Sequence, residues 1–162
     1  FIQVNDFRES NEKIVDLWKK YDKQFKEASS EEKHGSTLKI KLPCGRQMRY
    51  FNITPDGWSF TCFTQEKGSP QYNRFRYMYG SRIVENLCQG MARSVFAECL
   101  LNLQEAGYKT VLQIHDEAVV EVPEETAEQD ADTIESIMSK SPSWAVNLPV
   151  SAEASVVNFY KK

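Results

Sequence analysis

The sequence predicts an α+β fold, in which helices pack on one face of an antiparallel sheet. Apolar residues recur at helical spacing over two long segments, 10–28 and 81–106. Between these segments, apolar and polar residues alternate over 38–53, as they do in half-buried strands. The chain has 162 residues, of which 41% are hydrophobic and 27% charged, so we expect a folded core rather than disorder.

The first expected element is a helix over 10–28, with Ser10 or Asn11 as its N-cap. The apolar side chains that recur along it are Ile14, Leu17, Trp18, Tyr21 and Phe25. The sequence ASSEEKHGS (28–36) then predicts an exposed loop.

A small antiparallel meander is expected next. Its three strands are 38–42, 47–53 and 58–64. Turn residues separate them, at 43–46 and at 55–57. Segment 65–80 is polar and aromatic, with Gly68 and Pro70 near its start, and we expect it to be irregular.

The longest predicted helix covers 81–106, and Gly107 stands where a C′ glycine would end it. Two strands are expected to follow, KTVLQI (109–114) and AVVEV (118–122). They flank the three polar residues His-Asp-Glu.

An acidic helix is expected from Pro123 to about Ser139, because its first residues are acidic and acids near an N-terminus suit the helix dipole. Pro142 and Pro149 bracket a loop. The sequence VSAEASVV (150–157) predicts a final strand.

Charge is segregated along the chain. The 20 Lys/Arg and 23 Asp/Glu give a net charge of −3, yet residues 33–93 hold 10 Lys/Arg against 3 Asp/Glu, a net of +7. Residues 94–162 hold 4 against 12, a net of −8. This pattern is compatible with one face for a polyanion and another for cations, and equally with a solvated surface of segregated charge.

Cysteine spacing and hydropathy argue against several classes of protein. The four cysteines form no CxxC pair and the two histidines are far apart, so a structural zinc site has little support and reduced packing cysteines are expected. The residues concerned are Cys44, Cys62, Cys88, Cys99, His34 and His115. The apolar runs are too short to span a membrane and no signal-peptide pattern is visible, so we expect a cytoplasmic protein without a membrane partner. Because the chain begins with Phe1, we also expect a fragment, a processed product or an engineered piece of a longer protein.

The sequence VLQIHDEAVVEV (111–122) contains the strongest candidate site. His115, Asp116 and Glu117 occupy a tight turn between apolar strands, without the Asn-Gly or Asp-Gly pair that relieves strain in two-residue hairpins. Asp and Glu supply the hard oxygen ligands that Mg²⁺ takes together with substrate phosphates, and His115 would suit a phosphate or sugar. The apolar strands should present the acids on a buried support. The alternative is an ordinary solvated turn.

A second candidate cluster lies on the long predicted helix. Its polar residues are Arg82, Glu85, Asn86, Gln89 and Arg93. Gly90 follows Gln89 in the helix interior, where glycine costs about 1 kcal/mol relative to alanine. Close approach of another backbone, a nucleic acid or a packed helix would explain this glycine, and so would chance packing.

These motifs together resemble a known family. The stretch YGSRIVENLCQGMARSVFAECLLNLQEAGYKTVLQIHDEAVVEVP (79–123) is similar to the last part of the palm in family A (DNA polymerase I-like) DNA polymerases, above all in their bacteriophage branch. In that family a helix with a Gln-Gly or Gln-Ala pair leads into a strand, a His-Asp-Glu turn called motif C, and a second strand. Segments 12–58 and 149–162 resemble the stretch after the fingers helix and the closing segment, so the resemblance covers nearly the whole chain.

The resemblance implies that residues 1–162 form a single partial domain, the C-terminal palm region with the post-fingers helix and the small β-meander. One long helix would precede the motif C hairpin in the palm sheet. The chain would lack an exonuclease domain and complete fingers.

The resemblance also implies catalytic roles. Asp116 would be the motif C carboxylate that binds catalytic Mg²⁺, with Glu117 as its auxiliary neighbour and His115 near the primer terminus. Gln89 would reach the minor groove of the primer–template duplex. Weaker DNA contacts are expected from Arg82, Arg93 and Asn86, beside Glu85, where the family often has Asn.

The implied activity is DNA-directed DNA synthesis in replication, by two-metal nucleotidyl transfer with primer–template DNA and dNTP as partners. In this family the other metal-binding Asp lies upstream of the fingers, so we expect a complementary polymerase fragment or subunit and no activity from the chain alone. Glu153, in the last predicted strand, is expected to be structural. If the protein is phage-encoded, it would act in the cytoplasm of the bacterial host. The alternative is a non-catalytic DNA-binding or partner-binding module derived from a polymerase palm, which would use the +7 region.

Overall fold

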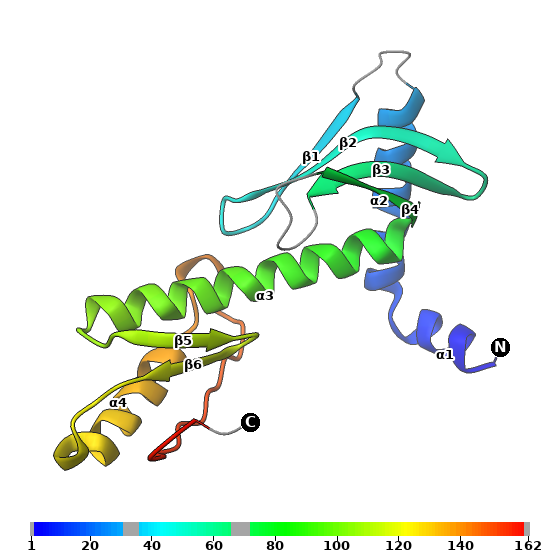
Figure 1. Cartoon of the computed structure of the whole chain (residues 1–162). Coiled ribbons are helices and arrows are strands. Elements are labelled where there is room, and N and C mark those ends of the chain that lie inside the picture. Colours follow the sequence, from blue (N-terminus) through cyan, green and yellow to red (C-terminus); the bar gives the residue numbers. More distant parts are fainter. Residues whose placement is uncertain (1, 31–35, 66–71, 161–162) are drawn as a thin grey trace. The chain divides into compact units, whose positions relative to one another are not determined.

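In the computed structural model, which describes residues 2–30, 36–65 and 72–160, helices and antiparallel strands confirm the predicted α+β class (Figure 1). The chain divides into an N-terminal unit, Phe1–Gly90, and a C-terminal unit, Met91–Lys162. The long helix α3 (Gly80–Glu105) contributes its first part to the N-terminal unit and its remainder to the C-terminal unit. That residues 1–162 form one partial domain of a larger protein stays a prediction.

The N-terminal unit begins with two helices, α1 (Ile2–Ser10) and α2 (Glu12–Ser30). Asn11 separates them: its side-chain amide donates to the Phe7 carbonyl at 2.8 Å, and its own carbonyl accepts backbone hydrogen bonds from the first turn of α2. The prediction of Asn11 as N-cap is therefore confirmed by position, whereas α1 was not predicted. The ring of Phe7 stacks on Trp18 with 6.2 Å between centroids. Because α2 continues to Ser30, the loop expected over 28–36 is wrong for its first residues, and 31–35 lie outside the described residues.

Four antiparallel strands form the sheet of this unit, in the order β1-β2-β3-β4. Their bounds are Thr37–Lys41, Gln47–Asp56, Ser59–Gln65 and Tyr72–Met78. The three predicted strands are confirmed, while β4 contradicts the irregular structure expected over 65–80. Its register against β3 shifts between Phe60 and Cys62, and Tyr77 has a positive φ of 58°, so a bulge interrupts the alternation from which a strand is predicted. Gly68 and Pro70 lie outside the described residues.

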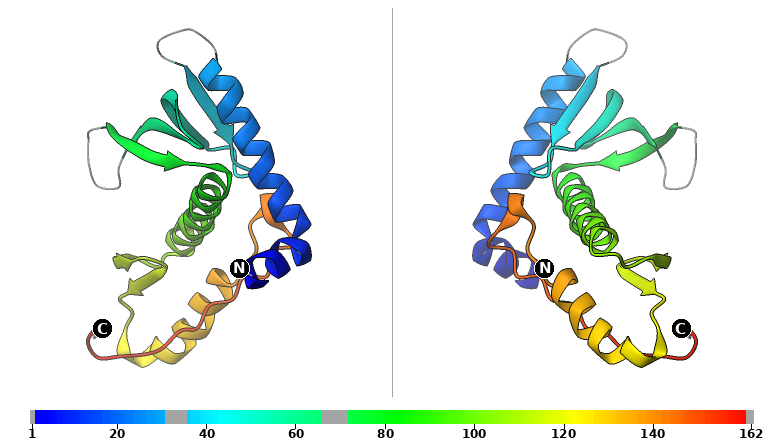
Figure 2. Two further views of the ribbon diagram at one scale, coloured as in Figure 1. Left: turned by 90° about the vertical axis from the view of Figure 1, so that its right-hand side faces the viewer. Right: turned by 90° about the vertical axis from the view of Figure 1, so that its left-hand side faces the viewer.

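One face of this sheet packs against α2 and forms the core (Figures 1 and 2). Phe25 of α2 is fully buried, and its ring lies 5.1 Å from that of Tyr50 and 5.7 Å from that of Phe60, centroid to centroid. Burial raises the pKa of Tyr50 to about 12 and that of the Cys62 thiol to about 11. The expected packing of this helix on a sheet is confirmed.

Two glycines allow close approach of α3 within the N-terminal unit. A Cβ at Gly80 would overlap the Trp18 carbonyl of α2, and the Gly80 amide donates to the Asp22 carboxylate at 2.6 Å. A Cβ at Gly90 would lie 3.1 Å from the Met48 sulfur and 3.3 Å from Leu42 Cδ1. Packing of the helix on the sheet therefore accounts for the interior glycine at position 90.

The C-terminal unit contains the end of α3 and a two-stranded antiparallel sheet. Its further elements are β5 (Thr110–Ile114), β6 (Glu117–Val120), the 3₁₀ turn η1 (Glu124–Thr126), helix α4 (Ala127–Met138) and the 3₁₀ turn η2 (Ser143–Ala145). The predicted long helix and the two strands are confirmed. The acidic helix is confirmed from Ala127 on, whereas the residues expected to start it form the 3₁₀ turn Glu124–Thr126.

Gly107 ends α3 as predicted. Its φ is +91°, its N–H donates to the Gln104 carbonyl at 3.1 Å, and the Tyr108 N–H donates to the Leu103 carbonyl at 2.9 Å. These two bonds form a Schellman motif, which needs a left-handed residue at C′.

The final strand predicted over 150–157 is wrong. In the structure this segment forms no strand, and side chains of α4 and its C-cap bind its backbone instead. The Ala152 N–H donates to Ser139 Oγ at 2.9 Å, and the Ala154 N–H donates to Glu135 Oε2 at 3.0 Å. The alternation of apolar and polar residues is typical of an extended chain, but it does not show that another strand lies beside the segment and pairs with it.

No disulfide joins the four cysteines. Cys62 and Cys99 are buried, as expected of packing residues, whereas Cys88 is exposed. No helix in the described part of the chain is both long and apolar enough to cross a membrane.

Candidate functional site

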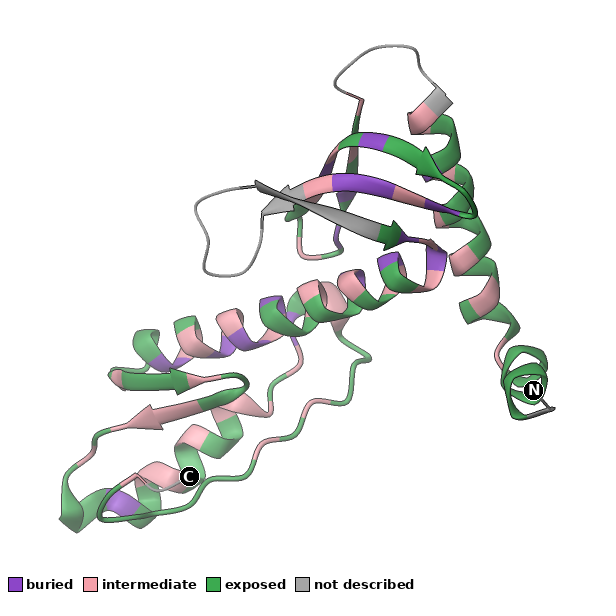
Figure 3. Cartoon of the chain, turned by 45° about the vertical axis from the view of Figure 1, so that its right-hand side comes forward, coloured by how far each residue is buried: buried purple, intermediate pink, exposed green. Residues whose placement is uncertain are grey.

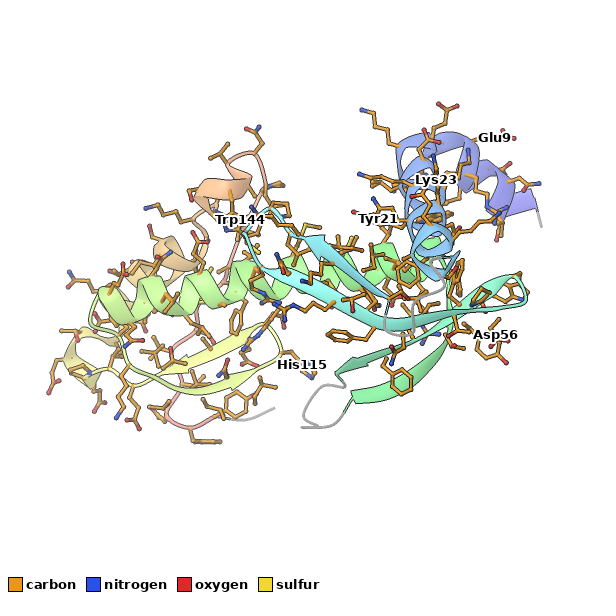
Figure 4. The ribbon with its side chains drawn as sticks, turned by 90° about the horizontal axis from the view of Figure 1, so that it is seen from above. Glu9, Tyr21, Lys23, Asp56, His115 and Trp144 are labelled. Atoms are coloured by element: carbon orange, nitrogen blue, oxygen red, sulfur yellow. The ribbon has the colours of Figure 1, made fainter. Side chains whose placement is uncertain are left out.

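The candidate site is the tip of the β5–β6 hairpin in the C-terminal unit (Figure 4). Ile114 pairs with Glu117, so His115 and Asp116 form a two-residue turn and Glu117 is the first residue of β6. The predicted hairpin is confirmed. His115 has a φ of +55°, the sign that the favoured hairpin turns require at their first central residue. A non-glycine residue in this region carries a strain of about 1 kcal/mol, and such strain recurs at functional sites.

The three side chains of the tip are exposed. The Tyr160 hydroxyl, near the C-terminus, donates to Glu117 Oε2 at 3.0 Å. Partial burial of the phenol, together with this bond to a carboxylate, raises the pKa of Tyr160. Asp116 and His115 make no hydrogen bond or ion pair with any residue that the structure describes, so the Asp116 carboxylate is open to a ligand.

The hairpin does not stand on the buried support that the sequence predicts. Val111 and Leu112 of β5 are 44% and 42% exposed, and the described hairpin contains no buried residue (Figure 3). The expectation was wrong because apolar composition indicates that burial of a strand is favourable, but it does not show that another element packs over that strand.

A hollow of about 1420 Å³ opens beside the hairpin within the C-terminal unit. Apolar residues of α3, β6, α4 and the segment 148–160 form most of its lining, and Asp116 and Glu117 belong to it. Within the described residues, no three His, Cys, Asp or Glu side chains gather as a metal site. The described acids at the turn are therefore a pair rather than a complete ligand set.

Arg93 lies in the same unit as this acid pair. Its Nη2 donates to Gln113 Oε1 of β5 at 3.1 Å, and its guanidinium carbon lies 5.3 Å from the centre of the Phe96 ring. The structure thus brings Arg93 to the strand that ends at the turn, with its guanidinium held on two sides.

The other polar residues predicted on the long helix belong to the N-terminal unit. Arg82, Glu85 and Gln89 are exposed on α3. Asn86 is half-buried, and its side-chain amide donates to the Tyr50 hydroxyl at 3.5 Å, a long hydrogen bond. Asn86 therefore has a packing partner, while Gln89 and Arg82 present their side chains to solvent.

Sequence reasoning missed Tyr160 and Gln113 as partners of the candidate residues. Tyr160 and Glu117 are 43 residues apart, and Arg93 and Gln113 are 20 apart. No local pattern signals either pair, because each depends on how distant segments fold back on the hairpin.

Comparison with curated proteins identifies similarity to a bacteriophage DNA polymerase, so the chain is related to a segment of such an enzyme. The relative is the DNA polymerase of Bacillus phage SP02, which is 34% identical over an alignment 176 positions long. The alignment covers 98% of this chain but 27% of that polymerase, so the chain spans about a quarter of its relative's length. No protein-family model matches the chain, and no solved structure matches it.

Proposed function

We propose that this chain is the C-terminal palm segment of a family A DNA polymerase of the bacteriophage branch, with the β5–β6 hairpin as motif C. The observation that carries the proposal is the exposed pair Asp116 and Glu117 at the tip of the β5–β6 hairpin, and this hairpin follows a long helix with a Gln-Gly pair. The similarity of nearly the whole chain to a phage DNA polymerase supports it.

The donor set at the tip fits part of a Mg²⁺ site. Mg²⁺ in proteins takes one or two carboxylates and completes its shell with water and substrate phosphates. Both Asp116 oxygens are free of described partners, and Glu117 keeps one oxygen outside its bond to Tyr160. Asp116 would hold the ion with Glu117 as auxiliary. When bound, the metal pair supplies the charge that activates the primer 3′ oxygen and stabilises the leaving pyrophosphate.

The remaining candidate residues would bind and orient DNA. His115, at the tip, would contact the primer terminus, and Arg93 would meet a phosphate with a guanidinium already oriented by Gln113. The exposed Gln89 amide both donates and accepts, as contact with minor-groove base edges requires. Arg82 would contact the backbone. Asn86 would act mainly by fixing the helix against Tyr50.

The C-terminal unit also carries features of an incomplete assembly. A two-stranded sheet is marginal in water, and β5 and β6 pair only with each other among the described strands. Exposed apolar residues line the neighbouring hollow. A complementary polymerase segment with the fingers and the first catalytic Asp would cover this surface and provide the missing carboxylate. If phage-encoded, that assembly would act in the bacterial cytoplasm.

Primer extension with a reconstituted enzyme tests the proposal. The chain is mixed with the part of the phage SP02 DNA polymerase outside the alignment, together with primer–template DNA, dNTP and Mg²⁺. We expect extension by the mixture, none by the chain alone, and a loss of about a thousandfold or more with Asp116→Ala, because a metal ligand is removed. Asp132→Ala, which removes an exposed acid of α4, is the matched control and should extend normally.

Two outcomes would contradict the proposal. Normal extension by the Asp116→Ala mixture would show that this carboxylate is not a catalytic ligand. Duplex binding by the chain that is insensitive to Mg²⁺ and to Asp116→Ala, with no extension in any mixture, would favour the non-catalytic DNA-binding module.

A further inference from the structure

The sheet of the N-terminal unit has a basic row on the face that does not meet α2. Ile40 and Tyr50 are buried on the α2 side. Since successive strand residues point to opposite faces, Lys39, Lys41 and Arg49 project from the other face, where all three are exposed. We call these three residues the basic face.

The register places like charges against each other. Lys39 on β1 lies directly opposite Arg49 on β2, and Lys41 lies opposite Gln47. Cβ atoms of such pairs are about 5 Å apart, and like charges in this position destabilise a sheet. The pair is therefore unfavourable in the isolated strands, and an anion above the sheet would relieve it.

No acidic side chain of β1 or β2 lies close enough to neutralise the charge of the basic face. None of its three side chains forms an ion pair with a described residue. The acid of β2, Asp56, is seven residues beyond Arg49, about 23 Å along an extended strand, at the turn into β3 (Figure 4). The positive charge is therefore available to a partner.

The arrangement of the cations indicates the shape of that partner. Lys39 and Lys41 are about 7 Å apart along β1, and Arg49 stands beside Lys39 on the neighbouring strand. The three charges follow the strands across an open face instead of converging on one point, so they fit an extended polyanion better than a single phosphate group.

We propose that the basic face binds the phosphate backbone of nucleic acid. The choice of nucleic acid among extended polyanions rests on the proposed function, while the face itself rests on register, burial and charge. A membrane surface fits less well, because membrane-binding elements combine cations with large exposed apolar groups, whereas Gln47 and Thr37 fill the adjacent positions and Phe51 is half-buried. Contacts of this kind position a duplex without reading its sequence.

Salt-dependent binding of the full chain tests this inference. Anisotropy of a fluorescent primer–template duplex is measured against KCl for the wild type and for the triple variant Lys39→Gln/Lys41→Gln/Arg49→Gln. Each lost phosphate contact lowers the slope of log K against log salt by about 0.9, so we expect a decrease of about 2.7 and a loss of affinity of about tenfold or more at ~0.1 M salt.

The matched control removes the same charge from the helix that covers the other face. Lys13→Gln/Lys20→Gln/Lys26→Gln changes three exposed lysines of α2 and should leave the slope nearly unchanged. A conservative variant, Lys39→Arg/Lys41→Arg/Arg49→Lys, keeps the charges and should bind as the wild type does. Circular dichroism of each variant verifies that the sheet is folded.

Three results would overturn the basic face as a nucleic-acid site: no duplex binding by the wild type at ~0.05 M salt, equal losses in the two glutamine triples, or a wild-type slope in the Lys39/Lys41/Arg49 variant. Competition by phosphatidylserine vesicles that exceeds competition by unlabelled duplex would assign the face to membranes instead.

The two proposals fail separately. Asp116→Ala leaves the basic face intact and should bind duplex without Mg²⁺ as the wild type does. Wild-type duplex binding by the glutamine triple, with extension still dependent on Asp116, would reject the basic face and keep the proposed function. Loss of duplex binding in the glutamine triple variant, with normal extension by Asp116→Ala, would keep the basic face and reject the proposed function.

Discussion

The N-terminal and C-terminal units differ in how they bury their apolar side chains. In the N-terminal unit a four-stranded sheet meets α2, and Phe25 and Tyr50 are excluded from water. In the C-terminal unit the two-stranded sheet remains half-exposed, as do Val156, Val157 and Phe159 near the C-terminus. Of the largest fully buried side chains described, only Leu103 belongs to the C-terminal unit.

The two units also differ in which candidate functional residues they contain. The unit with the buried core contains Gln89 and the basic face, which are expected to bind DNA. The unit with the exposed apolar surface contains Asp116 and Glu117. Under the proposed function, a carboxylate pair on a weakly covered hairpin would suit a site that is completed by assembly, because the covering element would bring the second metal ligand with it. Three pairs of substitutions test this difference in burial. Each pair changes one residue in the N-terminal unit and one in the C-terminal unit.

The largest expected effect is on the free energy of unfolding when a phenylalanine is removed from each unit. Phe25→Ala empties a fully buried position and should cost about 3–5 kcal/mol. Phe159→Ala removes a ring that is 72% exposed and should change stability by about 0.5 kcal/mol or less. Urea titration followed by tryptophan fluorescence measures both. Comparable losses would mean that the C-terminal segment is packed in solution.

A smaller difference is expected between two glycines of the α3 region. Gly80→Ala places a Cβ against the Trp18 backbone carbonyl, which cannot rotate away, and should cost about 3 kcal/mol. Gly107→Ala meets no neighbouring atom but forces alanine to a φ of +91°, which should cost about 1–2 kcal/mol. Thermal unfolding by circular dichroism gives the two values. The reverse order would contradict the close approach of α2 and α3 at Gly80.

The smallest expected effect is on how the free energy of unfolding changes with pH under alkaline conditions. The folded-state pKa of Tyr50 is raised from 10.0 to about 12, so its neutral form stabilises the fold below pH ~10, and this contribution is lost as the pH rises towards 12. The loss is on the order of 2 kcal/mol. Tyr50→Phe should remove this dependence.

Tyr160 supplies the matched control for that titration. Its pKa is also raised, by partial burial and by the bond to Glu117, and its contribution is likewise lost only as the pH rises above the unfolded value. Because Tyr160 is much more exposed than Tyr50, Tyr160→Phe should change the slope of stability against pH less. Urea midpoints between pH 8 and about 11.5 measure both; a larger change in the Tyr160 variant would contradict the contrast.

Several elements were predictable from local patterns. Helical spacing located α2 and α3, alternation located β1 to β3, and a glycine at position 107 marked the end of α3. The polar turn between two short apolar strands also follows from sequence, but the prediction placed three residues in it, whereas in the structure Glu117 pairs with Ile114 and only His115 and Asp116 remain in the turn.

Errors occurred where an element depends on its neighbours. A bulge at Tyr77 interrupts the alternation in β4, so the sequence did not predict this strand. Segment 150–157 has the alternation of a strand, but its backbone binds the side chains of Glu135 and Ser139 instead of another strand. The buried support expected under Asp116 failed for the same reason. A strand pattern reports the preference of one segment, while pairing and cover require a second segment at the right distance.

The sequence by itself determined the α+β class, the long helix, the polar turn at 115–117 and the segregation of charge, because these follow from composition and from the local periodicity of apolar residues. Only the tertiary structure decided that Gly90 packs on Met48, that Tyr160 holds Glu117, and that Lys39 stands opposite Arg49 on an open face. Such contacts depend on strand register and on the return of distant segments, which the free energy of the whole packed unit selects rather than any local preference.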